Sequence, residues 1–336
     1  MLFRRSLAVG LTLAALGAGP ASALDKLTLQ LKWVTQAQFA GYYVAEAKGF
    51  YKDEGLDVTI RSGGPDINPS QVIAGGGADV VLDWMPSALA TREKGVPLVN
   101  IAQIFQKSGM MLTCRKDAGI TKPEDFKGRT LGVWYGGNEH PFFAWMSKLG
   151  YSTSGAHPDV TILKQGFNVD PILQNQAPCI STTTYNEYWQ VVDGGIPVDD
   201  LLNFKYEDQG VATLEDGFWV LAKDLEDPAK VDKLARLVRA TMKGWRYALE
   251  NQEDSVGIVL DNDTSGAQTE QHQARMLGEV SRLIDKDGRQ PGVLDPADAE
   301  RTVDILLAGA STPVITTRPV GAWTSVVTDK AFGAAK

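Results

Sequence analysis

Short apolar segments of strand length alternate with segments of helix length along the chain, and this alternation restricts the fold more than any other feature. Leu27, Leu29 and Leu31 alternate with polar residues, as in a strand with one buried face. The other predicted strands lie at 57–60, 78–82, 98–105, 129–134, 160–163, 179–183, 202–204 and 218–221. The predicted helices between them lie at 39–48, 69–74, from 86 onward, 138–149, 169–175 and 185–192. This order predicts an α/β fold with mainly parallel sheets covered on both faces.

The last third of the sequence is predicted to be mainly helical. Asp227 followed by Pro228 is typical of a helix N-terminus. Apolar residues then recur every three or four positions, at Val231, Leu234, Val238, Met242, Trp245 and Leu249. That spacing predicts a long amphipathic helix. Further helices are predicted at 268–284 and 296–307, the second capped by Asp295, and the chain from Ser311 is predicted to be irregular.

The N-terminus has the three parts of a secretory signal. Arg4 and Arg5 are followed by an almost wholly apolar run at 7–16 and by Ala21-Ser22-Ala23, a small-x-small cleavage site. The apolar run is shorter than the roughly 20 residues that a membrane-spanning helix needs. We therefore expect residues 1–23 to be a signal peptide, cleaved near Ala23, and the mature protein to be periplasmic. The alternative is a buried N-terminal helix.

The charge of the chain is unsuited to nucleic acids and anionic membranes. The formal net charge is −8, and it becomes −10 once Arg4 and Arg5 are removed with the signal. Partners with phosphate backbones or anionic headgroups need basic patches. The sequence thus favours a small-molecule ligand and no nucleic acid, and we expect a monomer.

Cys114 and Cys179 are the two cysteines of the chain. Export would permit a disulfide between them, and two separate buried thiols are equally compatible with the sequence. A structural zinc site would need more ligands at suitable spacing, and none is visible. We expect neither a metal nor a cofactor.

Four segments resemble one family of proteins. These are GYYVAEAKGFYKDEGLDVTI at 41–60, GGGADVVLDWMPS at 75–87, KPEDFKGRTLGVWYGGNEHPFFAWMSKLG at 122–150 and CISTTTYNEYWQ at 179–190. They are similar to segments of type II periplasmic binding proteins, in the branch that binds sulfonates, nitrate-like solutes and pyrimidine precursors of thiamine. The resemblance covers most of residues 27–290.

The resemblance implies two α/β lobes joined by two crossing strands, with a ligand held in the cleft. Residues 24–112 and 207–336 would form the first lobe, and residues 113–206 the second. It also implies a protein that delivers a small molecule to the permease and ATPase of an ABC importer. In open α/β sheets ligands bind outside the carboxyl ends of the strands, which agrees with this placement.

Four tryptophans follow or end predicted strands. Trp33, Trp84 and Trp134 each end a strand, and Trp189 lies one turn into a helix. Aromatic faces at strand ends can form a slot for a planar ring. The alternative for each is packing in the core or between the lobes.

Two carboxylates lie beside these aromatic residues. Asp83 precedes Trp84, and Glu187 lies between Tyr185 and Trp189. A carboxylate in an aromatic slot can accept hydrogen bonds from a ligand amine. Asp83 could instead cap the helix near Pro86, and Glu187 could serve the dipole of its own helix.

Other polar groups are candidates for the same cleft. Gly136, Gly137 and Asn138 join a strand to a helix, where free backbone amides can bind a phosphate or carbonyl, although the same residues suit an ordinary turn and cap. Gln38 and Tyr42, together with Gln36, follow Trp33 closely enough to reach the ligand.

Catalysis has little support in the sequence. The three histidines lie in unrelated contexts, and no nucleophile or phosphate-binding motif is present. The resemblance extends to a fungal pyrimidine synthase of the same fold that uses a cysteine-rich patch and a reactive histidine. Here the matching segment, CISTTTYNEYW, has one cysteine and no histidine. We expect a binding protein for a 4-aminopyrimidine; the alternatives are a flavin or other heterocycle, an alkyl sulfonate, or an exported enzyme.

Overall fold

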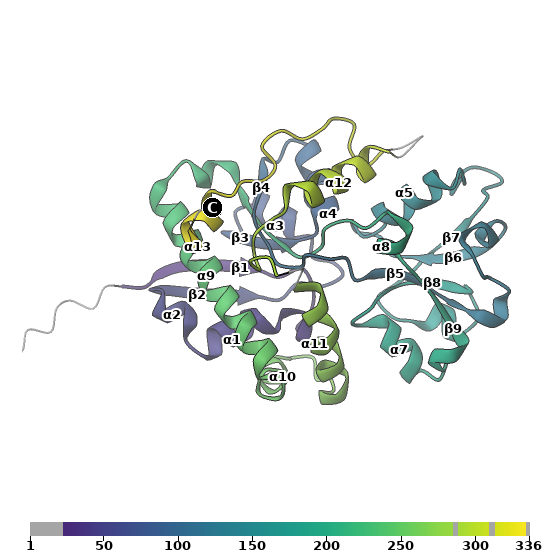
Figure 1. Cartoon of the computed structure of the whole chain (residues 1–336), viewed down its shortest axis with the longest axis horizontal. Helices are drawn as coiled ribbons and strands as arrows, with labels where there is room; N and C mark the ends of the chain where they lie inside the picture. Colours follow the sequence, from purple (N-terminus) through teal and green to yellow (C-terminus); the bar gives the residue numbers. More distant parts are fainter. Residues whose placement is uncertain (1–22, 285–287, 309–312, 334–336) are drawn as a thin grey trace, which may run out of the picture.

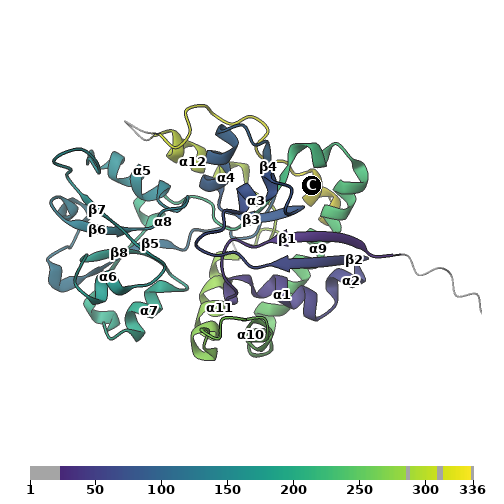
Figure 2. The ribbon, with the colours of Figure 1, turned by 180° about the vertical axis from the view of Figure 1, so that it is seen from behind.

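The structure is a computed structural model that describes residues 23–284, 288–308 and 313–333. Except for Ala23, the predicted signal peptide lies outside these ranges. The described chain forms two lobes, each built around a five-stranded mixed sheet with helices on both faces (Figures 1 and 2). This arrangement confirms the predicted two-lobed α/β fold. No helix in the described ranges combines the length and apolar character needed to cross a membrane.

The sheet of the first lobe has the strand order β2-β1-β3-β10-β4, and that of the second has the order β7-β6-β8-β5-β9. The strands of the first are β1 (Asp25–Gln30), β2 (Leu56–Arg61), β3 (Val80–Asp83), β4 (Leu98–Gln103) and β10 (Gly217–Leu221). Those of the second are β5 (Met110–Arg115), β6 (Thr130–Val133), β7 (Thr161–Lys164), β8 (Cys179–Thr183) and β9 (Leu201–Lys205).

Helices fill the connections between strands. In the first lobe these are α1 (Ala40–Ala47), α2 (Phe50–Asp53), α3 (Pro69–Ala74) and α4 (Met85–Glu93). In the second they are α5 (His140–Lys148), α6 (Asp170–Leu173), α7 (Glu187–Asp193) and α8 (Tyr206–Gln209). After β10 the chain adds α9 (Pro228–Glu250), α10 (Gln252–Asp261), α11 (Glu270–Ile284), α12 (Pro296–Leu307) and α13 (Val326–Phe332). Short 3-10 helices lie at Ala37–Phe39, Lys116–Ala118, Pro123–Phe126, Val198–Asp200 and Ala222–Leu225.

Each sheet contains one antiparallel strand, and the path of the chain explains why. The other strands run parallel and end at the edge facing the opposite lobe. The chain crosses between lobes at that edge, through residues 104–109 and 210–216, which we call the crossing segments. A strand that starts there must run away from the cleft. Accordingly β5 is antiparallel to β8 and β9, and β10 is antiparallel to β3 and β4.

A buried carboxyl group joins the two crossing segments. Glu215 Oε1 accepts hydrogen bonds from the Ser108 hydroxyl (2.6 Å), the Gly109 amide (2.8 Å) and the Met110 amide (3.1 Å). The side chain of Glu215 is shielded from solvent almost completely. The two segments are therefore tied to each other next to the cleft.

The long helix α9 packs against α1 through two glycines. Asp227 caps α9 by accepting a hydrogen bond from the Ala229 amide, as predicted. A Cβ atom on Gly244 would overlap the carbonyl oxygen of Gly41, and one on Gly41 would overlap the Trp245 ring. Only glycine permits this close contact between the two helices.

The structure adds one strand and four helices to those predicted, and it corrects one helix start. Strand β5 and helices α2, α8, α10 and α13 were not predicted as separate elements. Helix α5 begins at His140, after Glu139, so Asn138 is not its cap. The remaining predicted strands and helices match observed elements, with ends that differ by up to a few residues.

Candidate functional site

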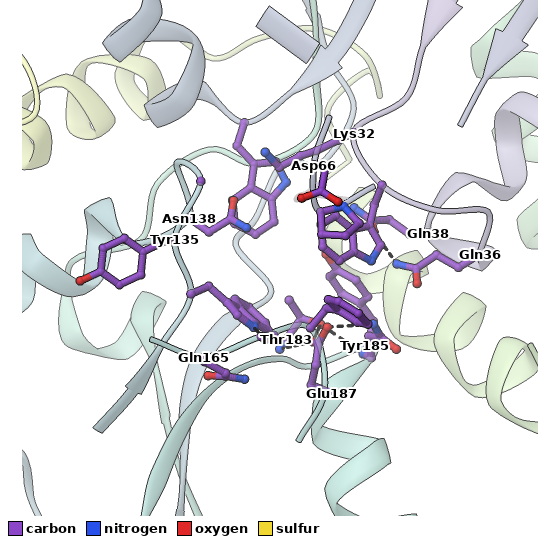
Figure 3. Close-up of a pocket in the computed structure, with 18 of the residues that line it drawn as sticks. Lys32, Gln36, Gln38, Asp66, Tyr135, Asn138, Gln165, Thr183, Tyr185 and Glu187 are labelled. Carbon is purple, nitrogen blue, oxygen red and sulfur yellow. Dashed lines mark hydrogen bonds between the residues drawn. The ribbon is translucent and has the colours of Figure 1, made fainter. Parts of the chain in front are cut away.

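A cavity of about 360 Å³ lies between the lobes at the carboxyl ends of the parallel strands (Figure 3). The first lobe contributes Lys32, Trp33, Gln36, Gln38, Pro65, Asp66 and Trp84. The second lobe contributes Trp134, Tyr135, Gly136, Asn138, Lys164, Gln165, Gly166, Phe167, Thr183, Tyr185, Asn186 and Glu187. Neither lobe encloses a ligand by itself.

Most of the residues that the sequence pointed to line this cavity. They are Trp33, Gln38, Trp84, Trp134, Gly136, Asn138, Tyr185 and Glu187, with Gln36 beside them. The structure places four others outside its lining, namely Tyr42, Asp83, Gly137 and Trp189. A different physical reason explains why each of these four residues lies outside the lining.

Tyr42 belongs to the core of the first lobe. It lies on α1, fully buried, with its ring 5.7 Å from the ring centroids of both Phe218 and Trp245. The residues after Trp33 run through a 3-10 turn into α1, and that turn directs Tyr42 away from the cleft.

Trp189 points away from the cavity because α7 begins at Glu187. Two residues further along an α-helix is a rotation of about 200°, so Glu187 and Trp189 lie on opposite faces. The indole ring instead stacks under the Arg275 guanidinium, whose carbon lies 4.5 Å from the ring centroid.

Asp83 is fully buried and uses its carboxylate within the protein. It accepts hydrogen bonds from Lys32 Nζ (3.0 Å), Ser70 Oγ (2.6 Å), Ser87 Oγ (3.1 Å) and the Trp84 amide (2.8 Å). These four donors occupy its acceptor sites. Asp83 consequently holds Lys32 at the cavity wall instead of contacting a ligand.

Lys32 is a site residue that the sequence reasoning missed. It is 8% exposed, lines the cavity, and holds its ammonium group 5.1 Å from the centroid of the Trp84 ring. The signal was a lysine at a strand end directly before Trp33, a position where a charge needs a partner. Asp83 is that partner.

Glu187 is the carboxylate that faces the cavity. Its Oε2 accepts from the Thr183 amide (3.0 Å) and hydroxyl (2.9 Å), and its Oε1 accepts from Asn186 Nδ2 (2.8 Å). A carboxylate has about four acceptor positions, so one remains for a ligand. Burial raises the pKa of Glu187 above its usual range, while these hydrogen bonds oppose that rise.

The ring nitrogens of two cavity tryptophans are bonded within the protein. Trp84 Nε1 donates to Asp216 Oδ1 (2.8 Å), and Trp134 Nε1 donates to the Gly166 carbonyl (3.1 Å). Asp216 also accepts from Gln38 Nε2. Burial raises the pKa of Asp216 to about 6. With these polar edges satisfied, the indoles offer apolar faces for stacking.

The glycine turn of the second lobe is less suited to anions than the sequence implied. Gly136 and Gly137 have φ values of 79° and 102°, which favour glycine. The Gly137 amide donates to Glu139 Oε2 (2.8 Å) and so is already occupied by a carboxylate. Asn138 Oδ1 is buried and has no hydrogen-bond partner among the described residues, which leaves an acceptor beside the cavity.

Two of the aromatic side chains that line the cavity are exposed to solvent. Phe167 and Tyr135 are 64% and 40% exposed, and Lys164 Nζ lies 5.7 Å from the Tyr135 ring centroid. Within the described ranges, no group of three or more histidine, cysteine or acidic side chains is arranged to hold a metal ion. The cavity lining thus combines aromatic faces with buried polar side chains.

Comparisons with known proteins agree with this fold. The sequence profile of the family described as NMT1/THI5 like matches residues 36–255. The chain is 25% identical over 243 residues to a formylaminopyrimidine-binding protein of Halalkalibacterium halodurans, covering 71% of each chain. It is 26% identical to the riboflavin-binding protein RibY of Chloroflexus aurantiacus, covering 70% of this chain and 66% of that one.

The chain is also similar to an enzyme in part of its sequence and to a sulfonate-binding protein in its fold. A 4-amino-5-hydroxymethyl-2-methylpyrimidine phosphate synthase of Saccharomyces cerevisiae, THI11, is 30% identical over 111 residues, which is 32% of each chain. The alkanesulfonate-binding protein SsuA of Xanthomonas axonopodis, solved with MOPS, has a TM-score of 0.62 at 13% identity. That match covers 86% of this chain and 94% of SsuA, and it supports the fold alone.

Proposed function

The chain belongs to the NMT1/THI5-like family, and from this membership and the cleft we propose that it binds a small planar heterocycle bearing an amine. The ligand that fits best is a 4-aminopyrimidine related to the precursors of thiamine. The observation that carries the proposal is Glu187, a buried acceptor set among aromatic faces. A relative of similar length binds formylaminopyrimidine, according to its name.

The chemistry of the cavity selects for a ring with polar substituents at its edge. Trp84 and Trp134 offer faces for stacking, which alone accepts any flat ring. Glu187 accepts hydrogen bonds only, so a ligand without a donor would leave its remaining buried acceptor position unfilled. Lys32 lies on the first-lobe side of the cavity, across from Glu187, and would donate to a ring nitrogen or carbonyl (Figure 3).

A flavin is the second candidate ligand. The RibY relative and the exposed aromatic rim formed by Tyr135 and Phe167 favour it. The cavity of about 360 Å³ lies at the small end of the usual range for ligand sites, which favours the single ring. A sulfonate is disfavoured because the Gly137 amide is occupied and Glu187 would repel the anion.

Isothermal titration calorimetry with three compounds tests the ligand class. The probes are 4-amino-5-hydroxymethyl-2-methylpyrimidine, riboflavin and an alkanesulfonate, with mass spectrometry of any compound that copurifies from the native host. We expect the pyrimidine to bind most tightly. Binding of riboflavin or the sulfonate alone would overturn the proposed ligand, and turnover of a bound pyrimidine would favour the enzyme alternative.

We further propose that the protein is exported and serves the permease and ATPase of an ABC importer. The predicted signal ends at Ala23, and strand β1 begins at Asp25, so cleavage there would leave every described strand and helix in the mature chain. The intact mass of protein from the periplasmic fraction tests the export step. A mass beginning at Leu24 is expected, and a mass that retains residues 1–23 would contradict it.

The proposed lobes, residues 24–112 with 207–336 and residues 113–206, would close on the ligand by rotation about the crossing segments. Small-angle scattering should give a smaller radius of gyration when a tightly bound ligand is added. An unchanged radius at saturation would contradict a closing motion.

A further inference from the structure

Two helices from different lobes meet beside the cavity. Helix α7 belongs to the second lobe and begins with Glu187, and α11 belongs to the first lobe. Both views of the ribbon place the two helices side by side (Figures 1 and 2). His272 Nε2 on α11 lies 2.8 Å from Asn186 Oδ1, directly before α7. The lobes are thus linked by a hydrogen bond one residue away from the proposed ligand-reading carboxylate.

The direction of this hydrogen bond follows from the neighbours of Asn186. Its amide nitrogen donates to Glu187 Oε1 (2.8 Å), because a carboxylate can only accept. The amide oxygen of Asn186 therefore faces His272 and Gln190. The Gln190 side chain donates to this oxygen through its own Nε2 (3.0 Å). It follows that His272 carries its hydrogen on Nε2, and the donors run from His272 through Asn186 to Glu187.

A second contact between the same helices lies further from the cavity. Arg275 NH1 is 3.1 Å from both carboxylate oxygens of Asp193, and its guanidinium covers the Trp189 ring. The side chains of Arg275 and Asp193 are 25% and 52% exposed. An ion pair this exposed contributes little stability, so it can break when the lobes open.

We infer that Asn186 and His272 are positioning residues that couple recognition of the ligand by Glu187 to closure of the two lobes. The inference rests on the proposed function, because it assigns Glu187 to the ligand. Asn186 lines the cavity and His272 does not. A charged Glu187 fixes the Asn186 amide with its oxygen toward the first lobe, and only that orientation accepts the hydrogen bond from His272.

This link does not depend on the protonation of His272. Burial and the charge of Arg275 lower its pKa, whereas Asp193 raises it. Nε2 carries a hydrogen in the imidazolium and in the neutral tautomer assigned above, so the bond to Asn186 persists in both forms. The coupling should accordingly appear as an effect of sequence changes on ligand affinity and not as a pH switch at His272.

The test compares His272→Ala with His272→Gln, which can place an amide nitrogen near the position of Nε2, and with His157→Ala as a matched control. His157 is exposed on the second lobe, away from the cavity lining. Titration with 4-amino-5-hydroxymethyl-2-methylpyrimidine should show a roughly three- to tenfold weaker affinity for His272→Ala, the range for one net hydrogen bond. His272→Gln should recover most of it, and His157→Ala should match the wild type.

A double-mutant cycle with Glu187→Gln tests the coupling itself. A glutamine at 187 keeps its oxygen toward the Thr183 amide, so its nitrogen faces Asn186 and no longer holds the Asn186 oxygen toward His272. The loss caused by His272→Ala should therefore shrink in the Glu187→Gln background. Equal losses in both backgrounds would overturn the inference.

Hydrogen exchange without ligand separates this inference from the ligand proposal. Amides of residues 186–193 and 270–277 should exchange faster in His272→Ala and in Arg275→Ala than in the wild type, while the Tm of each variant confirms folding. If the pyrimidine fails to bind the wild type, the ligand is wrong and the exchange data still test the contact. Unchanged exchange in both variants would overturn the inferred coupling through the contact between α7 and α11.

Discussion

Cys114 on β5 and Cys179 on β8 stand opposite each other in the second sheet and form a disulfide, with their Cα atoms 4.0 Å apart. The sequence left a disulfide and two free thiols equally possible. Antiparallel pairing of β5 with β8 decides between them, because it brings two residues separated by 65 positions to the same rung of the sheet.

Removing this disulfide should lower the free energy of unfolding by about 2–4 kcal/mol, because the unfolded chain would regain the freedom of a long closed loop. The double variant Cys114→Ala/Cys179→Ala, compared with the wild type by urea denaturation, measures the loss. Reduction of the wild type should approach the same midpoint. A variant as stable as the oxidised wild type would show that the bond contributes nothing.

Replacing Glu187 by glutamine should weaken binding of 4-amino-5-hydroxymethyl-2-methylpyrimidine by about 1.5–3 kcal/mol, the range for a hydrogen bond to a charged group. The change keeps the size of the side chain and removes its charge. Because burial raises the Glu187 pKa, wild-type affinity should also fall as the pH drops through that raised value, and the variant should lack this dependence. Calorimetry at several pH values checks both statements; equal binding by the two proteins would remove Glu187 from the site.

Glu215 should make the protein less stable as the pH rises. Burial, aided by the charge of Asp216, raises the Glu215 pKa to about 8, so the folded state holds a proton that the unfolded state releases near pH 4.5. The stabilising effect of this proton is complete below that lower value and is lost as the pH climbs to about 8, with a slope of at most about 1.4 kcal/mol per pH unit.

Glu215→Gln isolates this contribution. A glutamine can keep Oε1 toward Ser108 and place its amide nitrogen where Oε2 now lies buried, without a hydrogen-bond partner among the described residues. Thermal unfolding between pH 5 and 9 should give a flatter profile for the variant. Parallel profiles for the two proteins would mean that Glu215 stays charged in the folded state.

The contact between α1 and α9 should not tolerate a methyl group. Gly244→Ala would force the helices apart against the Gly41 carbonyl, at a cost of about 1–3 kcal/mol. Gly257, on α10, is the matched control because a Cβ there meets open space, and alanine favours helix by up to about 1 kcal/mol. In chemical denaturation, Gly244→Ala should have a lower free energy of unfolding than the wild type, and Gly257→Ala should have a free energy of unfolding equal to or higher than that of the wild type.

The fold could be predicted because its signals are local. Asp227 before Pro228 marks the start of α9, Asp295 before Pro296 marks the start of α12, and the strand predicted at 179–183 is β8. The antiparallel strand β5 carried no such signal, since its direction follows from where the chain crosses between lobes.

The site was predicted only in part, because local signals place strand ends but do not determine the direction of every side chain. Strand ends placed Trp84, Trp134 and Glu187 correctly at the cleft, but which way a side chain turns depends on the start of the next helix. A start of α7 at Glu187 turned Trp189 toward Arg275, a residue 86 positions away in the sequence. Asp83 was expected to contact the ligand or to cap a helix, and it instead holds Lys32 at the cavity wall, because the four donors around Asp83 come together only in the folded lobe.

The interior position of β10 also sets the order in which the two sheets have all their strands synthesised. β10 lies between β3 and β4, so the first sheet is incomplete until Leu221 has been synthesised. Every strand of the second sheet lies between Met110 and Lys205. Although the chain begins in the first lobe, the second lobe is therefore the first to have all the strands of its sheet synthesised. Strand β4 lacks its neighbour in the sheet until β10 is made, more than a hundred residues later.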